Sequence, residues 1–114
     1  MKGTYLGEFE EIVLLTVALL GEGAYGVAIR KELEVQADRK VSIGAVHAAC
    51  NRLEDKGFLR ANFGESSTRR GGKRKKLYRV TQAGQAALTK SRELRESLWN
   101  QLPPAAFDLN ISWS

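Results

Sequence analysis

The sequence is poor in the residues from which disulfides, metal sites and many catalytic centres are built. Its 114 residues include one cysteine, Cys50, and one histidine, His47. A single cysteine cannot form an intrachain disulfide, and these two residues are too few for a zinc site made of cysteines and histidines. The low cysteine content also fits a reducing compartment. We therefore expect a soluble, cytoplasmic protein that needs no cofactor.

Long hydrophobic stretches are missing as well. The longest apolar run, residues 12–20, has nine residues, whereas a membrane-spanning helix needs about 20. The chain does not open with a charged segment followed by an apolar stretch and a small-residue cleavage site, so we predict no signal peptide. We therefore expect no contact with a membrane.

Acidic residues are almost absent from one segment of the chain. The net charge is +5, and residues 60–79 hold eight basic residues but a single acid, Glu65. The remainder of the chain is slightly acidic, so its basic character is local. A local basic patch indicates a contact surface for a polyanion.

Hydrophobic periodicity predicts four helices and one hairpin. Apolar residues recur at three- and four-residue steps in four segments, as buried helix faces require. These segments are residues 9–20, 24–35, 43–55 and 82–102. In the first segment the expected buried stripe is Phe9, Ile12, Val13, Thr16, Leu19 and Leu20. Ser42 and Thr81 are the expected N-caps of the last two. Two runs of β-type residues, 58–65 and 76–81, predict a two-stranded hairpin with a long polar loop.

This order of elements predicts a mainly α (α+β) fold, a winged helix-turn-helix with a two-stranded wing and a C-terminal dimerisation helix. We expect the winged unit to span residues 5–81, the dimerisation helix residues 82–102, and a tail residues 103–114. Pro103 and Pro104 end the last helix because proline cannot continue it.

The third helix has two contrasting faces. Ile43, Val46, Cys50 and Leu53 form an apolar stripe, so Cys50 is expected to be a buried structural thiol. The opposite face carries small and polar residues, which suit a helix that enters the major groove of DNA, about 12 Å wide. The residues of this opposite face are Gly44, His47, Ala48, Asn51, Arg52 and Asp55.

Three interpretations of His47 remain open: contact with a base or phosphate, a plain exposed histidine, and a catalytic base. A catalytic base needs a neighbouring nucleophile or an orienting carboxylate, which the helical spacing does not provide. Asn51, one turn further on, is a residue type that hydrogen-bonds base edges. The pattern therefore favours DNA contact over catalysis.

The basic loop "RRGGKRKK" can be a solvated charge run, a nuclear-localisation signal or the tip of a wing. Strand patterns on both sides favour the wing, because they place its charges for phosphate contacts.

The segment "GEGAYG", residues 21–26, matches the glycine pattern of a dinucleotide-binding loop. Such a loop requires a βαβ unit within a parallel sheet, and no further parallel strands are predicted. We interpret the segment as a tight turn between the first two helices.

The last helix carries apolar residues beyond the compact winged unit, and these need a partner. We assign dimerisation to Leu88, Leu94, Leu98, Trp99 and Leu102. A symmetric dimer matches the two half-sites that helix-turn-helix proteins commonly read. Packing within the chain is the alternative for some of these residues.

Three segments in order resemble the PadR family of transcriptional regulators. They are the opening "LGEFEEIVLLTVALLGEGAYGVAIRKELE", the helix segment "VSIGAVHAACNRLEDKGFL" and the wing segment "GGKRKKLYRVTQAGQAAL". The resemblance implies a winged-helix homodimer that binds double-stranded DNA, usually as a repressor of nearby genes, with the third helix in the major groove and the wing on the backbone. Carried onto this sequence, it implies that the DNA-reading residues of the third helix are Ser42, Gly44, Ala45, His47, Ala48, Asn51 and Arg52. It likewise implies that the DNA-binding residues of the wing are Arg69, Arg70, Lys73, Arg74 and Lys75.

The resemblance also bears on two aromatic residues and on His47. Tyr25 looks like a family tyrosine that can reach a phosphate, although it fits the core equally well. Trp99 could bind a small aromatic effector near the dimer interface, as in some small members, or simply pack the dimer. His47 stands where members commonly have an aromatic residue, so we expect a different base preference.

The leading hypothesis is therefore a sequence-specific, homodimeric repressor, released in some family members by a small-molecule inducer. The alternative is a protein-interaction module whose basic hairpin docks an acidic partner without specific DNA binding. An enzyme is not expected, because no carboxylate pair, nucleophile–base pair or metal cluster can be assembled from the sequence.

Overall fold

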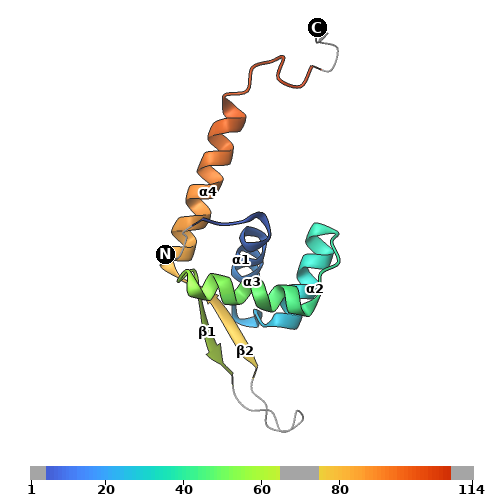
Figure 1. Ribbon diagram of the computed structural model, residues 1–114, viewed down its shortest axis with the longest axis vertical. Helices are drawn as coiled ribbons and strands as arrows, with labels where there is room; N and C mark the ends of the chain where they lie inside the picture. Colours follow the sequence, from blue (N-terminus) through green and yellow to red (C-terminus); the bar gives the residue numbers. More distant parts are fainter. Residues whose placement is uncertain (1–4, 65–74, 109–114) are drawn as a thin grey trace.

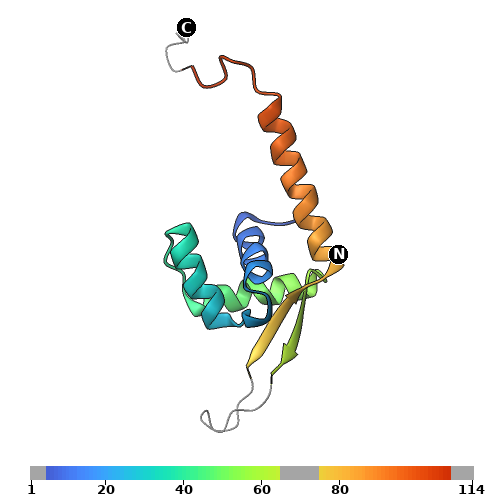
Figure 2. The same ribbon diagram turned by 180° about the vertical axis from the view of Figure 1, so that it is seen from behind.

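The computed structural model describes residues 5–64 and 75–108 and has the predicted order of elements. These are α1 (Glu8–Leu20), the 3₁₀ helix η1 (Gly21–Gly23), α2 (Gly26–Ala37), α3 (Ile43–Asp55), β1 (Leu59–Phe63), β2 (Lys76–Val80) and α4 (Gln82–Asn100). The first three helices pack together with the hairpin at one end, and α4 extends away from them (Figures 1 and 2). The mainly helical, winged helix-turn-helix fold is confirmed.

Helix α1 supplies much of the core, although its buried face differs from the predicted one. Val13, Leu14 and Val17 are buried, whereas Leu19, expected in the stripe, is 65% exposed. Residues 12–20 are apolar apart from Thr16, so periodicity alone does not select one face of this helix. The hydroxyl of Thr16 is satisfied locally by donating to the Ile12 carbonyl at 2.7 Å.

The glycines between α1 and α2 form a turn, as expected. Gly21 ends α1 with φ at 60°, a conformation that favours glycine, and its N–H donates to the Val17 carbonyl. In the described part of the chain, β1 and β2 form one two-stranded antiparallel sheet and no βαβ unit is present. The dinucleotide-loop interpretation therefore has no structural support.

Helix α2 begins two residues later than predicted. Tyr25 lies before it with an extended backbone (φ −113°, ψ 162°), because it forms an isolated antiparallel bridge with Leu77 of β2. Nearby, the Tyr78 N–H donates to the Ala24 carbonyl at 2.9 Å. The hairpin is therefore joined to the turn that precedes α2.

Helix α3 has the predicted cap, and its predicted apolar stripe is buried except at Ile43, which is 37% exposed at the start of the helix. The Ser42 hydroxyl accepts a hydrogen bond from the Ala45 N–H at 3.0 Å, and Val46, Cys50 and Leu53 are fully buried. Burial, with a smaller contribution from the Glu54 carboxylate, raises the pKa of the Cys50 thiol to about 11. This thiol is therefore a protonated core group at neutral pH.

Helix α4 is fixed to the hairpin at its first turn. The Thr81 hydroxyl accepts from the Gly84 N–H at 3.0 Å and donates to the Gly57 carbonyl at 2.6 Å. A β-carbon on Gly84 would lie 2.4 Å from the Phe58 carbonyl oxygen, so only glycine fits there. This close contact sets where α4 leaves the winged unit.

Candidate nucleic-acid interface

The face of α3 opposite the core is exposed and has little side-chain bulk. Gly44, Ala45 and Ala48 are exposed together with His47 and Asn51, and α3 lies across the front of the molecule in Figure 1. The opposite face of α3 carries Val46, Ala49, Cys50 and Leu53, which are buried in the hydrophobic core and anchor the helix there. The structure thus brings the predicted reading residues together on one accessible helix face, where small side chains permit close approach to DNA.

Arg52 belongs to the same helix but is held by another element. Its Nε donates to the Glu10 carboxylate at 2.8 Å, while about half of the side chain (52%) stays exposed. Lys56 Nζ binds the other oxygen of Glu10 at 2.6 Å and also donates to the Tyr5 carbonyl. Sequence spacing could not reveal this contact, because Glu10 and Arg52 are 42 positions apart.

Glu10 is a buried carboxylate, 6% exposed, with a full set of donors. Burial raises its pKa, but the hydrogen bonds from Lys56, Arg52 and the Gly7 N–H outweigh this effect, so the pKa lies below its ordinary value of 4.5. The charged carboxylate therefore ties the end of α3 to α1 at neutral pH. This cluster fixes the orientation of α3 on the core.

The root of the wing is tied to the turn before α2. Lys75 Nζ lies 4.2 Å from the centre of the Tyr25 ring, a cation–π contact. Lys76 Nζ pairs with Glu54 of α3 at 3.2 Å. Of the predicted wing residues, Lys75 is described and lies immediately before β2; Arg69, Arg70, Lys73 and Arg74 lie outside the described residues.

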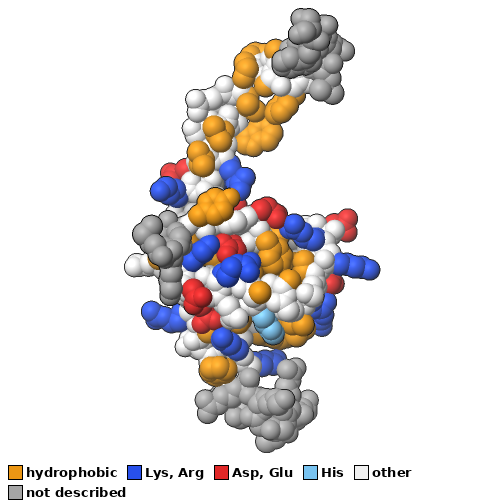
Figure 3. All heavy atoms as spheres, viewed as in Figure 1, with side chains coloured by type: hydrophobic (Ala, Val, Ile, Leu, Met, Phe, Trp, Pro, Cys, Tyr) orange, Lys and Arg blue, Asp and Glu red, His pale blue; other side chains and the backbone are white. Residues whose placement is uncertain are grey.

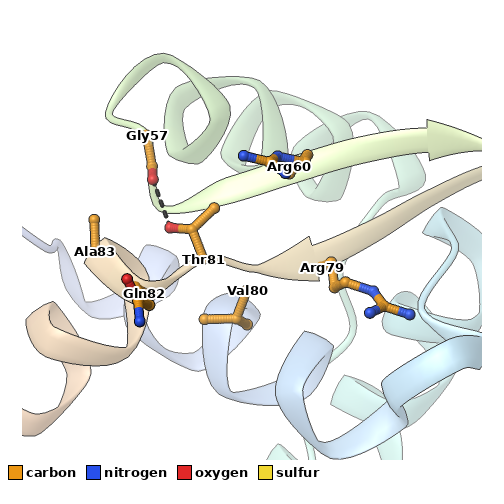
Figure 4. Close-up of a pocket in the computed structure, with 7 residues that line it drawn as sticks. All are labelled: Gly57, Arg60, Arg79, Val80, Thr81, Gln82 and Ala83. Carbon is orange, nitrogen blue, oxygen red and sulfur yellow. Dashed lines mark hydrogen bonds between the residues drawn. The ribbon is translucent and has the colours of Figure 1, made fainter.

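Sequence reasoning missed two arginines in the hairpin. Arg60 and Arg79 are directly opposite each other in the β1–β2 register, and both are exposed. They line an open hollow of about 440 Å³ with Gly57, Val80, Thr81, Gln82 and Ala83 (Figure 4). Two facing like charges are unfavourable without an anion nearby. Both belong to the basic segment, and the strand register was the signal that could have paired them.

The far half of α4 exposes apolar side chains. Leu94, Leu98 and Trp99 are 61%, 56% and 65% exposed, and Leu102, two residues past the end of the helix, is 41% exposed. Hydrophobic side chains gather on this part of the molecule in Figure 3. The Trp99 ring lies 5.9 Å from that of Phe107. Leu88, also assigned to dimerisation, instead packs in part against the core of its own chain.

The described residues provide neither a membrane-spanning helix nor a metal site. Within residues 5–64 and 75–108, no helix is long and apolar enough to cross a membrane. Over the same residues, no group of three or more His, Cys, Asp and Glu side chains is placed to hold a metal ion. His47 makes no hydrogen bond or ion pair within this part of the chain, so no described group orients it as a base.

Known proteins provide an independent comparison. A PadR-family transcriptional regulator from Eggerthella lenta DSM 2243 has a similar structure, with a TM-score of 0.63, 25% identity, and coverage of 82% of this chain and 80% of that one. A PadR-like transcription factor from Bacteroides fragilis has a TM-score of 0.61 and 25% identity, with coverage of 82% of this chain and 89% of that one. A PadR-family transcription regulator from Clostridium difficile R20291 has a TM-score of 0.59 and 26% identity, with coverage of 79% of this chain and 95% of that one.

No curated protein has a significantly similar sequence. The model of the PadR-like family of transcriptional regulators matches residues 14–90, which include the second half of α1, all of α2 and α3, the hairpin and the start of α4. This match covers more than half of the sequence and agrees with the fold and with the exposed face of α3. The chain therefore belongs to the PadR-like family of transcriptional regulators, a family of transcription factors rather than enzymes.

Proposed function

We propose that the protein is a homodimeric repressor that binds a specific DNA sequence. The observation that carries this proposal is the exposed face of α3, which combines small residues with His47 and Asn51 beside a basic hairpin. A helix of this shape fits the major groove, and the hairpin lies at the end of the same unit. Repression would follow from occupying a site that transcription of a nearby gene requires.

In this proposal the first turns of α3 read bases. Gly44, Ala45 and Ala48 allow the helix backbone to approach the groove, and Ser42 caps the helix at its start. The Asn51 amide can both donate and accept, as contact with adenine requires. Arg52 contributes a phosphate contact with the half of its side chain that Glu10 leaves exposed.

The wing supplies affinity rather than sequence choice. Its proposed phosphate contacts are Arg69, Arg70, Lys73, Arg74 and Lys75. Lys75, immediately before β2, extends over Tyr25, so Tyr25 acts mainly as a platform for this lysine and contacts a phosphate at its edge. Cations held near the phosphates release counterions from DNA, which makes binding dependent on salt.

The far half of α4, together with Leu102 just past its end, is proposed to form the dimer. Leu94, Leu98 and Leu102 recur at four-residue steps and are exposed, with Trp99 beside them. Removing such side chains from water against the same surface of a second copy is favourable. A flat aromatic effector that binds beside Trp99 would change this packing and release the DNA.

Binding measurements with two variants test the separate roles proposed for the wing, which supplies affinity, and for α3, which selects the DNA sequence. Replacing Lys73, Arg74 and Lys75 with alanine should weaken binding to all DNA sequences and reduce the slope of log affinity against log salt by about 3 per subunit. Asn51→Ala should instead relax the preference at one base pair. If the triple variant binds with unchanged affinity and slope, the wing has no role in DNA binding; a protein that never distinguishes sequences would instead fit docking to an acidic partner.

A further inference from the structure

His47 contacts the helix that precedes α3. Gly26, the first residue of α2, is buried, and a β-carbon placed on it would lie 2.6 Å from His47 Nε2 and 3.2 Å from His47 Cδ2. These distances show that one edge of the imidazole lies on the bare α-carbon of Gly26. The opposite edge of the ring, which carries Nδ1, therefore faces away from α2.

Glycine is not needed at position 26 for its backbone freedom. The positive-φ glycines of the described chain are Gly21 and Gly57, so the Gly26 backbone is one that alanine adopts without strain. What glycine provides here is space for the imidazole. The remaining near neighbour, Ile43 Cδ1, would lie 3.4 Å from the added carbon, which is close to ordinary contact.

We propose that Gly26 is a specificity-determining positioning residue: its missing side chain seats the His47 imidazole and selects the ring edge that faces DNA. This inference rests on the proposed function, in which α3 reads bases. Gly26 itself touches no DNA. A histidine held by one edge presents one donor or acceptor in a fixed direction, and that direction determines which base it accepts.

The geometry separates this role from a purely structural one. The atoms that an added methyl group would displace belong to the tip of an exposed side chain, which can swing into solvent. Gly26→Ala should therefore fold with an unchanged or slightly raised melting temperature, because alanine favours helix. The ring of His47, however, must turn, and its preferred base should change.

The experiment uses the full chain and selects bound sequences from random DNA at near-physiological salt. It compares the wild-type protein with Gly26→Ala, His47→Ala and the double variant. Gly23→Ala is the matched control, because a β-carbon on Gly23 meets nothing within 4 Å. Affinity for non-specific DNA and the melting temperature are measured for every variant.

We expect Gly26→Ala to reduce discrimination about tenfold at the base pair that also loses discrimination in His47→Ala. The double variant should equal His47→Ala, because without an imidazole the methyl group at position 26 displaces nothing. Non-specific affinity and the control should match the wild type.

Three results would overturn the inference. Gly26→Ala could retain the wild-type preference while the wild type clearly selects a sequence, or it could change preference equally in the His47→Ala background. Both leave the proposed function intact. If the wild type selects no sequence at all, the proposed function and the inference fail together.

Discussion

The winged unit and the far half of α4 differ in how much of their hydrophobic side-chain surface is buried. In the winged unit, Leu14, Ile29, Leu33 and Leu53 are all fully buried by neighbouring elements of the same chain. Beyond Arg95, which still binds Glu11 of α1 at 2.8 Å, α4 leaves the core and keeps its leucines and Trp99 exposed. One region buries its large apolar side chains within the chain, and the other leaves them exposed, as the proposed dimer requires.

This difference indicates two kinds of partner. The winged unit presents polar and small residues on α3, which can exchange water for base and phosphate contacts without exposing apolar area. The far half of α4 presents an apolar helix surface, for which a second helix of the same kind is the suitable partner. Changes confined to one region should therefore affect one kind of binding directly.

Breaking the far half of α4 should have the largest effect. Replacing Leu98 and Trp99 together with glutamate should raise the dimer dissociation constant about a thousandfold, because two large buried contacts at an interface contribute roughly 2 kcal/mol each. Sedimentation equilibrium measures this constant. Glu93→Ala, on the opposite side of α4, is the control and should leave it unchanged; a double variant that remains dimeric would place the interface elsewhere.

The joint between the two regions should be the next most sensitive place. Gly84→Ala forces a methyl group against the Phe58 carbonyl and Val80 Cγ1, at 2.4 and 2.9 Å, and backbone cannot move aside as a side chain can. We expect a loss of about 2 kcal/mol in unfolding free energy and a melting temperature roughly 10 °C lower. Gly23→Ala should melt like the wild type. Equal melting of both variants would contradict the close contact.

Within the winged unit, replacing Glu10 tests how much its ion pairs with α3 and Lys56 contribute to stability. Glu10→Gln should lower the unfolding free energy by about 1.5 kcal/mol, because Arg52 and Lys56 lose a charged partner. The folded-state pKa of Glu10 is lowered, so its contribution is complete above the ordinary value of 4.5 and disappears as pH falls through the folded-state pKa. Denaturant titrations at pH 7 and pH 3 should therefore differ less for the variant than for the wild type.

The smallest expected effect concerns one wing charge. Lys75→Ala should weaken DNA binding about fivefold at 0.15 M salt, a change of roughly 1 kcal/mol, and reduce the salt slope by about 1 per subunit. Lys90→Ala removes the same charge from the exposed surface of α4 and is the matched control in gel-shift titrations. Equal losses in both variants would indicate a general effect of net charge.

Local signals in the sequence were sufficient for the elements and their order. Ser42 and Thr81 cap α3 and α4 as predicted, because capping depends on residues three positions apart. The buried face of α1 was misplaced at Leu19, since an almost entirely apolar run has no periodicity to read. Tyr25 was placed inside α2 because its pairing with Leu77 is made by a distant strand.

The contacts that position the residues of the candidate site could not be predicted from the sequence, because they join elements that are distant in the chain. Glu10 meets Arg52, Gly26 meets His47, and Gly84 meets Phe58 through packing of elements far apart in the chain. Each of these residues has an ordinary local interpretation as an acid or a helix glycine. Only the three-dimensional arrangement shows which residue each of them contacts.

Selection of bound sequences from random double-stranded DNA, at near-physiological salt, tests the central claim most directly. A dimer that inserts one α3 into each of two successive major grooves should enrich a two-fold symmetric site, with half-sites about one helical turn apart. Specific affinity should exceed non-specific affinity by about a thousandfold or more. Recovery of random sequence, with equal affinity for every DNA, would contradict the account.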